Sequence, residues 1–239
     1  MLAKLISPDN ADRKSAEAAL KQFEDGDPSH YLLELALIST AQEDLENPAT
    51  VRQLAANLLR QYVEEHGGEQ GRSGESMVNT EVKKKLVEIL LPSLNVGDAE
   101  IRDSNAHIVA TVIKQNWQSM WEKVLPVLRK MMNTTDNDKV LSSLKVVSGI
   151  FDGTFYDEVF LKCSYSLLPS VAQLIFSPQT SDNSRVHARN FLPPYIKLMT
   201  RFGGSTFVDE VRSNFKRCEL SDLAEVCVLS DRSHYYFLV

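Results

Sequence analysis

The sequence has few cysteines and no long apolar run, and both shortages limit what the chain can be. Three cysteines, Cys163, Cys218 and Cys227, are spread over 239 residues at spacings unlike those of a zinc module. Such sparse use is typical of a reducing compartment, where thiols act as small apolar residues. No stretch approaches the roughly 20 apolar residues that a membrane span needs, so we expect no membrane association. The start, MLAKLISPDN, has too short an apolar run for a signal peptide.

Motifs for catalysis and cofactor binding are also missing. The five histidines stand at spacings that match no metal site: His30, His66, His107, His187 and His234. His107 lies on a predicted helix that is otherwise apolar, which favours a hydrogen-bonded structural histidine over a ligand. Gly67-Gly68 and Gly203-Gly204 lack the lysine and helix start of a phosphate-binding loop. The sequence therefore predicts no enzyme, no cofactor and no metal site. An α-helical enzyme stays the third alternative, which a ligand cluster on facing helices would support.

Negative charge is concentrated at one end of the chain. Residues 1–66 hold twelve acids and six bases, and the difference equals the whole net charge of −6. Residues 67–239 are therefore neutral overall. An acidic end disfavours direct binding to nucleic acid and favours basic partners. The alternative is a solvated helical surface without a partner.

The sequence does contain a repeated helix pattern, clearest at residues 48–66, PATVRQLAANLLRQYVEEH. Arg13 aligns with Arg52 at an offset of 39 residues, and Arg102 aligns with Arg52 at an offset of 50 residues. A fainter copy lies at Arg185–Leu192. Spacings near 40 to 50 between similar helices are typical of HEAT-type solenoids. The sequence predicts an all-α fold, a HEAT-repeat α-solenoid that forms a right-handed superhelical arch of about five helix pairs. Solenoids mostly present binding surfaces, so we expect partners rather than a catalytic pocket.

Caps, prolines and glycines set the boundaries of the predicted helices. These helices run over residues 9–24, 31–43, 48–66, 80–94, 98–116, 117–132, 136–150, 157–176, 182–202 and 207–229. Leu91-Pro92, Leu125-Pro126 and Leu168-Pro169 are each expected to bend the second helix of a pair. Pro193-Pro194 is expected to kink or split its helix.

Four regions follow from this pattern. Residues 1–66 form the first repeats, and residues 67–79 form a mobile loop because four glycines and small polar residues cannot pack a core. Residues 80–229 form further HEAT repeats. Residues 230–239 form an atypical tail, since its apolar ending lacks the polar face of a solenoid cap.

Two segments carry a resemblance to a known family. Residues 11–17, ADRKSAE, lead into Leu20 and Phe23, and VRQLAANLLRQYV follows at residues 51–63. This ordered set resembles the amino-terminal region of the importin-β (karyopherin-β) family. The segments QYVEEH, at residues 61–66, and NWQSMW, at residues 116–121, are most similar to the importin-nine branch. The resemblance covers roughly residues 5–200.

The sequence departs from the family pattern in two places. The family's tryptophan after the VRQLA helix is absent, because His66 is followed by Gly67-Gly68. The chain is also far shorter than a family receptor of about twenty repeats. We therefore expect a fragment or a shortened product, and the last six residues favour an abnormal end.

The resemblance implies a binding function. Family members bind Ran-GTP on their first repeats, carry cargo between cytoplasm and nucleus, and touch nuclear pore Phe-Gly repeats through apolar slots between outer helices. The importin-nine branch implies very basic protein cargo, such as histones or ribosomal proteins. The alternative is a HEAT-repeat scaffold without a transport role, such as a phosphatase or complex-assembly subunit. Binding to Ran-GTP over Ran-GDP separates these two functions.

The resemblance also gives candidate residues for Ran binding, which are polar positions on the second helices. They are Glu34, Lys83, Lys84 and Glu88, and a solvated surface is the alternative for each.

Two arginines and two tryptophans also stand at positions that allow either a structural or a binding role. Arg52 and Arg102 occupy matching places, where they either pair with an acid of a neighbouring helix or bind a ligand. Trp117 and Trp121 lie four residues apart on one helix face. They either pack between repeats or form a pocket for phenylalanine side chains.

Overall fold

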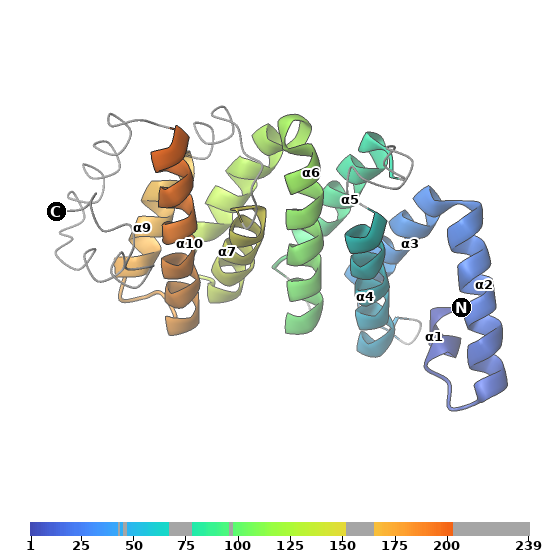
Figure 1. Ribbon diagram of the computed structural model, residues 1–239. Coiled ribbons are helices and arrows are strands. Elements are labelled where there is room, and N and C mark those ends of the chain that lie inside the picture. Colours follow the sequence, from blue (N-terminus) through green and yellow to red (C-terminus); the bar gives the residue numbers. More distant parts are fainter. Residues whose placement is uncertain (43, 45–46, 67–77, 96–97, 152–164, 203–239) are drawn as a thin grey trace. The chain divides into compact units, whose positions relative to one another are not determined.

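The computed structural model describes residues 1–42, 44, 47–66, 78–95, 98–151 and 165–202, and all regular structure within these ranges is helical (Figure 1). The elements are α1 (Leu2–Leu5), α2 (Asn10–Gly26), α3 (Pro28–Thr40), α4 (Ala49–His66), α5 (Thr80–Ser93), α6 (Ala99–Met132), α7 (Asn137–Phe151), the 3-10 helix η1 (Tyr165–Leu167), α9 (Leu168–Phe176) and α10 (Asp182–Phe202). The all-α prediction is confirmed for these ranges.

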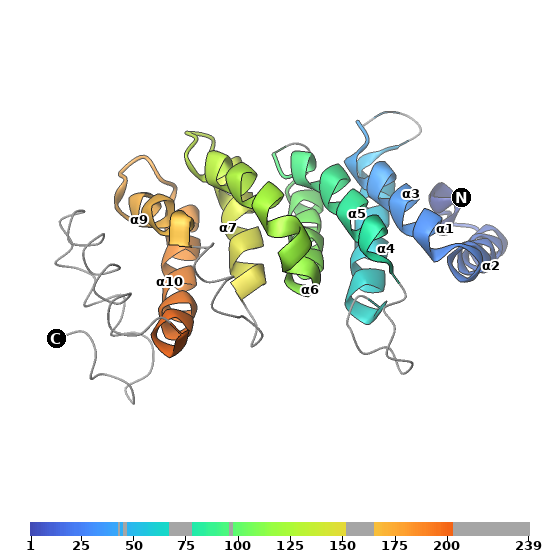
Figure 2. The same ribbon diagram turned by 90° about the horizontal axis from the view of Figure 1, so that it is seen from above.

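The chain divides into two compact units, Met1–Met120 and Trp121–Val239. In the first unit, α3 packs against α2, α4 and α5, and Figure 2 shows α3 and α5 side by side. In the second unit, α10 packs against both α7 and α9. Both α3 and α10 therefore contact more than one neighbouring helix, as the helices of stacked HEAT repeats do.

Side-chain caps start several helices where the sequence placed them. The Asp9 carboxylate accepts a hydrogen bond from Ala11 N at 2.7 Å, at the start of α2. The Asp27 carboxylate accepts from His30 N at 3.0 Å, and Pro28 occupies the first position of α3. Such caps satisfy backbone N–H groups that have no partner within the helix.

Helix α3 differs from its prediction in length and in burial. It ends at Thr40 rather than at residue 43, and the hydroxyls of Ser39 and Thr40 both donate to Ala36 O, at 2.9 and 3.0 Å. Hydroxyls that bond to the preceding turn compete with the backbone and disfavour continuation of the helix. The sequence of this helix is apolar over most of its surface, which predicts a helix enclosed by its neighbours, but Leu37 is 50% exposed.

The predicted helix break is found in the structure, whereas the prolines occupy different positions within their helices. The boundary predicted after residue 116 is confirmed, because Asn116 has non-helical dihedral angles (φ −139°, ψ 34°) within α6. Pro92 and Pro126 lie inside α5 and α6 as expected. Pro169 instead lies in the first turn of α9, where proline is tolerated. Pro193-Pro194 does not split α10, which is continuous through it.

Several predictions fall on residues outside the described ranges. They concern most of the loop at residues 67–79, the helices at 157–164 and 207–229, the tail at 230–239 and the three cysteines. The end of the predicted loop is described and is packed. Val78 is buried, and the Asn79 side chain accepts from Val82 N at 2.9 Å as the cap of α5.

The repeated arginine has the same position in four helices. Arg13, Arg52, Arg102 and Arg185 are each the fourth residue of their helix, in α2, α4, α6 and α10 respectively. The position three residues later is buried in all four helices, and so is the position seven residues later. These positions hold Ala16, Ala55, Asn105 and Ala188, followed by Leu20, Leu59, Val109 and Leu192. Ten residues after the arginine stand Phe23, Tyr62, Val112 and Tyr195. Because spacings of 3, 7 and 10 fall on one side of an α-helix, the repeat is a shared core face.

The arginine fastens the helix to the turn that precedes it. Arg13 Nη1 donates to Ser7 O at 2.7 Å and to Pro8 O at 2.9 Å. Arg185 Nη2 donates to Thr180 O at 3.0 Å. The prediction of an acid partner or a ligand was made for Arg52 and Arg102 and stays a prediction, whereas Arg13 and Arg185 bind backbone carbonyls. A guanidinium suits this task because its planar fork offers several donors at once.

We predict that Arg185→Met lowers the free energy of unfolding by about 1–3 kcal/mol, because it leaves acceptors such as Thr180 O and Ser177 O without their donor. Urea unfolding followed by circular dichroism measures the change. Arg189→Met, at an exposed position of the same helix, is the matched control and should stay within about 0.5 kcal/mol of wild type. Equal effects of the two variants would contradict the anchoring role.

Candidate functional site

The polar face of α3 and α5 holds three of the four sequence-predicted Ran-binding candidates at accessible positions. The Glu34 carboxylate, on α3, lies 3.2 Å from His30 Nε2. On α5, Lys84 Nζ lies 2.8 Å from the Glu81 carboxylate, and Glu88 is exposed. Since α3 and α5 are in contact, these charges belong to neighbouring helices of one layer. The accessible side chains of these helices therefore include both acids and a base.

Lys83 differs from the other three candidates because its side chain is only 4% exposed. A buried lysine cannot offer its ammonium to a partner without movement of the helix that carries it. Charge reversal there would also place a carboxylate in the core, which is costly. Lys83 therefore lies on the buried side of α5 and should be left unchanged in variants that test the surface.

A second set of polar contacts joins α4 to the first part of α6. Gln53 donates to the Glu100 carboxylate, and Ser104 Oγ donates to Asn57 Oδ1 at 3.5 Å. These contacts lie along facing sides of the two helices and help to set how one repeat stacks on the next. The sequence showed the repeat but not which residues would face each other across it.

His107 completes this α4–α6 set, and it does so at the surface. Its Nε2 lies 2.8 Å from Glu64 Oε1, with 45% of the His107 side chain exposed. The prediction of a hydrogen-bonded structural histidine is confirmed, but the apolar surroundings expected for it are not found. The pKa of Glu64 is lowered, first by the hydrogen bond from Arg60 and further by His107.

Aromatic rings connect the first three long helices. The Phe23 ring contacts the rings of His30 and Tyr31, and Tyr31 contacts Tyr62, with centroid separations of 5.4, 5.8 and 5.8 Å. His66 stacks on Tyr62 at 4.3 Å. Edge-on ring pairs of this kind stabilise packing beyond the area they bury. They fix α3, and with it the polar face that carries Glu34, against α2 and α4.

Burial changes the acid–base behaviour of the two tyrosines in this cluster. It raises the pKa of Tyr31 to about 12, with a further contribution from Glu24. The pKa of Tyr62 is raised for the same two reasons. Both phenols therefore stay neutral at physiological pH and act as core side chains rather than as acids or bases.

The tryptophan and metal predictions have separate outcomes. Trp121 is 2% exposed, which favours packing over a pocket open to phenylalanine side chains; the Trp117 side chain lies outside the described part. Within the described residues, no group of histidine, cysteine, aspartate and glutamate side chains is arranged to hold a metal ion. In the same residues, no helix is long and apolar enough to cross a membrane.

Comparison with known proteins finds sequence similarity to importins and a fold similar to that of solved importin structures. No family model matches the chain. The chain is 23% identical over 224 residues to Importin-9 of Drosophila melanogaster, a match that covers 90% of this chain and 21% of that protein. Among solved structures it is similar to the Kap95:Nup1 complex, with a TM-score of 0.66 and 18% identity over 94% of this chain and 27% of that chain.

A further solved structure shows Kap95p with RanGDP, in which Kap95p binding induces the switch loops of Ran to adopt the GTP-bound conformation. It matches with a TM-score of 0.65 and 17% identity, over 94% of this chain and 26% of that chain. These likenesses confirm the HEAT-repeat solenoid fold. The chain spans about a fifth of the length of the curated relative and about a quarter of the solved chains.

The raised pKa of Tyr31 predicts a loss of stability at alkaline pH. A tyrosine ionises near pH 10 in an unfolded chain and near pH 12 at Tyr31 in the folded one. Between these values the unfolded state releases a proton that the folded state keeps. The stabilising contribution is therefore complete below about pH 10 and is lost as the pH rises toward about 12.

Tyr31→Phe should remove this part of the pH dependence, as measured by urea unfolding at about pH 8 and about pH 11. At the lower pH the comparison with wild type gives the cost of the lost hydroxyl alone and serves as the control. Parallel pH profiles for wild type and Tyr31→Phe would rule out the Tyr31 phenol as the source.

Proposed function

We propose that the chain is an importin-β family member resembling importin-9, and that it forms the amino-terminal, Ran-GTP-binding part of a nuclear import receptor for basic proteins. The observation that carries this proposal is the contact between α3 and α5, the helices that carry the accessible charges of Glu34, Lys84 and Glu88. Support comes from the Kap95p–RanGDP structure, whose receptor has a similar fold. The activity proposed is binding rather than catalysis, and the protein would move between cytoplasm and nucleus.

Basic cargo is proposed from the charge of the first repeats. Twelve acids and six bases in residues 1–66 give this end of the chain a negative field, which attracts and orients basic proteins. The resemblance of the sequence to the importin-nine branch implies cargo of the histone or ribosomal protein type. The same field disfavours direct contact with nucleic acid.

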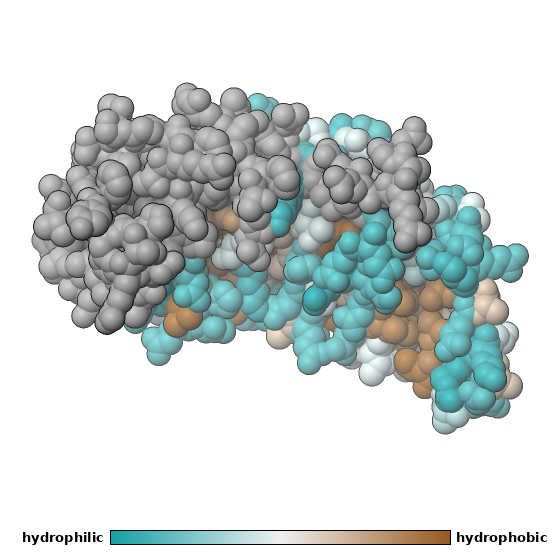
Figure 3. Space-filling model, viewed as in Figure 1, coloured by the Kyte–Doolittle hydropathy of each residue, from teal (hydrophilic) through white to brown (hydrophobic). Residues whose placement is uncertain are grey.

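Nuclear pore Phe-Gly repeats are the third proposed partner. Figure 3 shows apolar surface between polar side chains on the first unit. Two large apolar residues of this unit, Ile6 and Leu37, are exposed. Exposed apolar surface of this kind favours contact with phenylalanine side chains. The Kap95:Nup1 complex, which has a similar fold, supports this partner.

The Ran proposal predicts nucleotide-dependent binding that depends on the α3–α5 face. The chain should bind Ran-GTP in preference to Ran-GDP, because the switch segments of a GTPase change their order with the γ-phosphate. Combined reversal, Glu34→Lys with Lys84→Glu and Glu88→Lys, should weaken binding to Ran-GTP by about tenfold or more at unchanged helix content. Pull-downs with Ran in both nucleotide states and circular dichroism measure these effects.

Glu17→Lys is the matched control for this experiment. It lies at an exposed position of α2, away from the tested face, and changes the net charge of the chain by the same amount. If it weakens binding as much as the triple variant does, overall charge rather than the α3–α5 face is responsible. Equal binding to both nucleotide states, or none at low salt, would favour the HEAT scaffold without a transport role.

The cargo proposal predicts strongly salt-dependent binding. Association of a core histone with the chain should fall steeply as salt rises past about 0.15 M, where the Debye length is about 8 Å. A fluorescence titration with a labelled histone at increasing salt measures this dependence. Salt-insensitive binding would show that the acidic end is only a solvated surface.

A further inference from the structure

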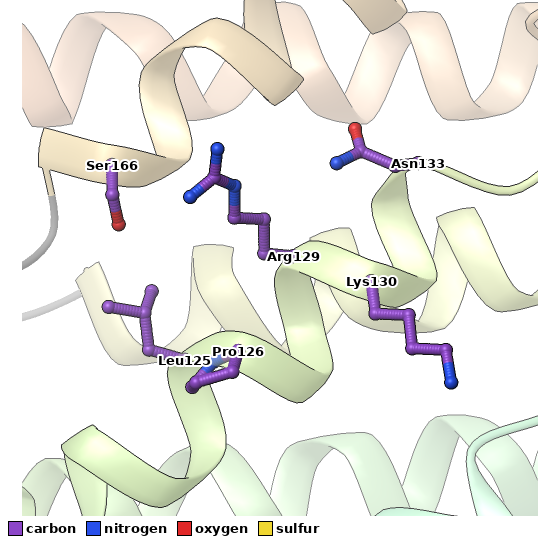
Figure 4. A pocket seen from close by; sticks show the side chains of 6 residues that line it. All are labelled: Leu125, Pro126, Arg129, Lys130, Asn133 and Ser166. Carbon is purple, nitrogen blue, oxygen red and sulfur yellow. The ribbon is translucent and has the colours of Figure 1, made fainter.

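The second unit contains a hollow of about 340 Å³ between the end of α6 and the 3-10 helix η1. Leu125, Pro126, Arg129 and Lys130 line it from α6, and Asn133 and Ser166 complete it (Figure 4). The α6 residues share one helix face because they are three and four positions apart. The volume is within the range of small ligand sites.

The two sides of this hollow differ in chemistry. In Figure 4 the Arg129 guanidinium extends between Ser166 and Asn133. The Lys130 side chain points away from the Arg129 guanidinium. Leu125 and Pro126 form an apolar wall beside the guanidinium. An occupant that uses the whole site would therefore carry a negative group and an adjacent apolar group.

The cations of the hollow are not used to hold the described structure together. Other basic side chains of this unit have acidic neighbours, such as Lys139 with Asp136 at 3.3 Å and Arg185 with Asp182 at 3.4 Å. Within the described residues, neither the Arg129 nor the Lys130 side chain forms an ion pair or hydrogen bond. Their place in the last turn of α6 complements the helix dipole, but that role needs neither the apolar wall nor the polar groups opposite.

We propose that this hollow binds an acidic peptide segment, with a glutamate or aspartate carboxylate on Arg129 and an aliphatic side chain on Leu125 and Pro126. The guanidinium fork matches a carboxylate and can donate two parallel hydrogen bonds to it. The amide of Asn133 and the hydroxyl of Ser166 offer further polar contacts at either side. A small free anion would use the guanidinium but not the apolar wall, which is why a peptide fits the site better.

This proposal is independent of the proposed transport function, because the ligand has the opposite charge to basic cargo and lies in the other unit. The test uses the full chain and a short fluorescein-labelled peptide in which glutamates alternate with leucines. Fluorescence anisotropy at low salt measures its affinity. Arg129→Gln should weaken binding about tenfold, since a hydrogen bond to a charged group is lost, and Arg129→Lys should weaken it less because the charge remains. Lys130→Gln should change affinity by less than Arg129→Gln.

Controls on both the protein and the peptide keep the proposal falsifiable. Arg189→Gln removes an exposed cation of the same unit outside the hollow and should leave the affinity unchanged. Peptides with glutamine in place of glutamate, or serine in place of leucine, should bind more weakly than the parent. Equal loss in the Arg129→Gln and Arg189→Gln variants would overturn the site in favour of diffuse charge attraction. Displacement by inorganic phosphate at concentrations as low as those of unlabelled peptide would overturn the peptide as ligand.

Discussion

The stacking of these repeats depends on one helix face that begins with an arginine and continues into the core. The chain reverses direction before these helices, so backbone carbonyls of the turn lie close to the start of the helix and can accept hydrogen bonds from it. Arg13 and Arg185 supply them with guanidinium groups that reach back across the turn. The small residue three positions later lets the neighbouring helix approach closely. The arginine thus fixes the angle at which the helix leaves the turn, and the apolar positions beyond it then meet their neighbours.

The third copy of this face shows what happens when the pattern changes. Asn105 occupies the place of alanine, is fully buried, and donates from Nδ2 to Ser93 Oγ at 3.0 Å. Ser93 Oγ in turn donates to Leu90 O at 2.7 Å. The aromatic position is Val112 here, whereas Tyr195 in the last copy packs with two phenylalanines at 5.2 Å each. A polar link between helices replaces ring packing in the middle copy. Buried polar groups need hydrogen-bond partners at defined positions. This copy therefore positions its neighbouring helix through directional hydrogen bonds more than through buried apolar area.

Much of this fold could be predicted from the sequence because the signals for it are local. The cap at Asp9, the break after residue 116 and the repeated helix face all lie within one or two turns of the residues that determine them. The errors lie where distant parts of the chain decide. Packing of α10 on α7 and α9 keeps it continuous through Pro193-Pro194, and the burial of Lys83 depends on which side of α5 faces the neighbouring repeats. Arg129 and Ser166 are far apart in the sequence and line the same hollow only in the folded structure. The spacing of residues in the sequence therefore could not reveal this hollow.

Charge is distributed so that the two units suit ligands of opposite sign. The first repeats are acidic, whereas the hollow of the second unit presents Arg129 and Lys130 without acidic partners in the described residues. Screening limits exposed charges to about 8–10 Å at physiological salt, so each region acts on whatever lies directly against it, and the net charge of −6 describes neither. A basic protein and an acidic segment could then bind the same chain through separate surfaces. Salt would weaken both contacts alike, and only the sign of the ligand's charge distinguishes them.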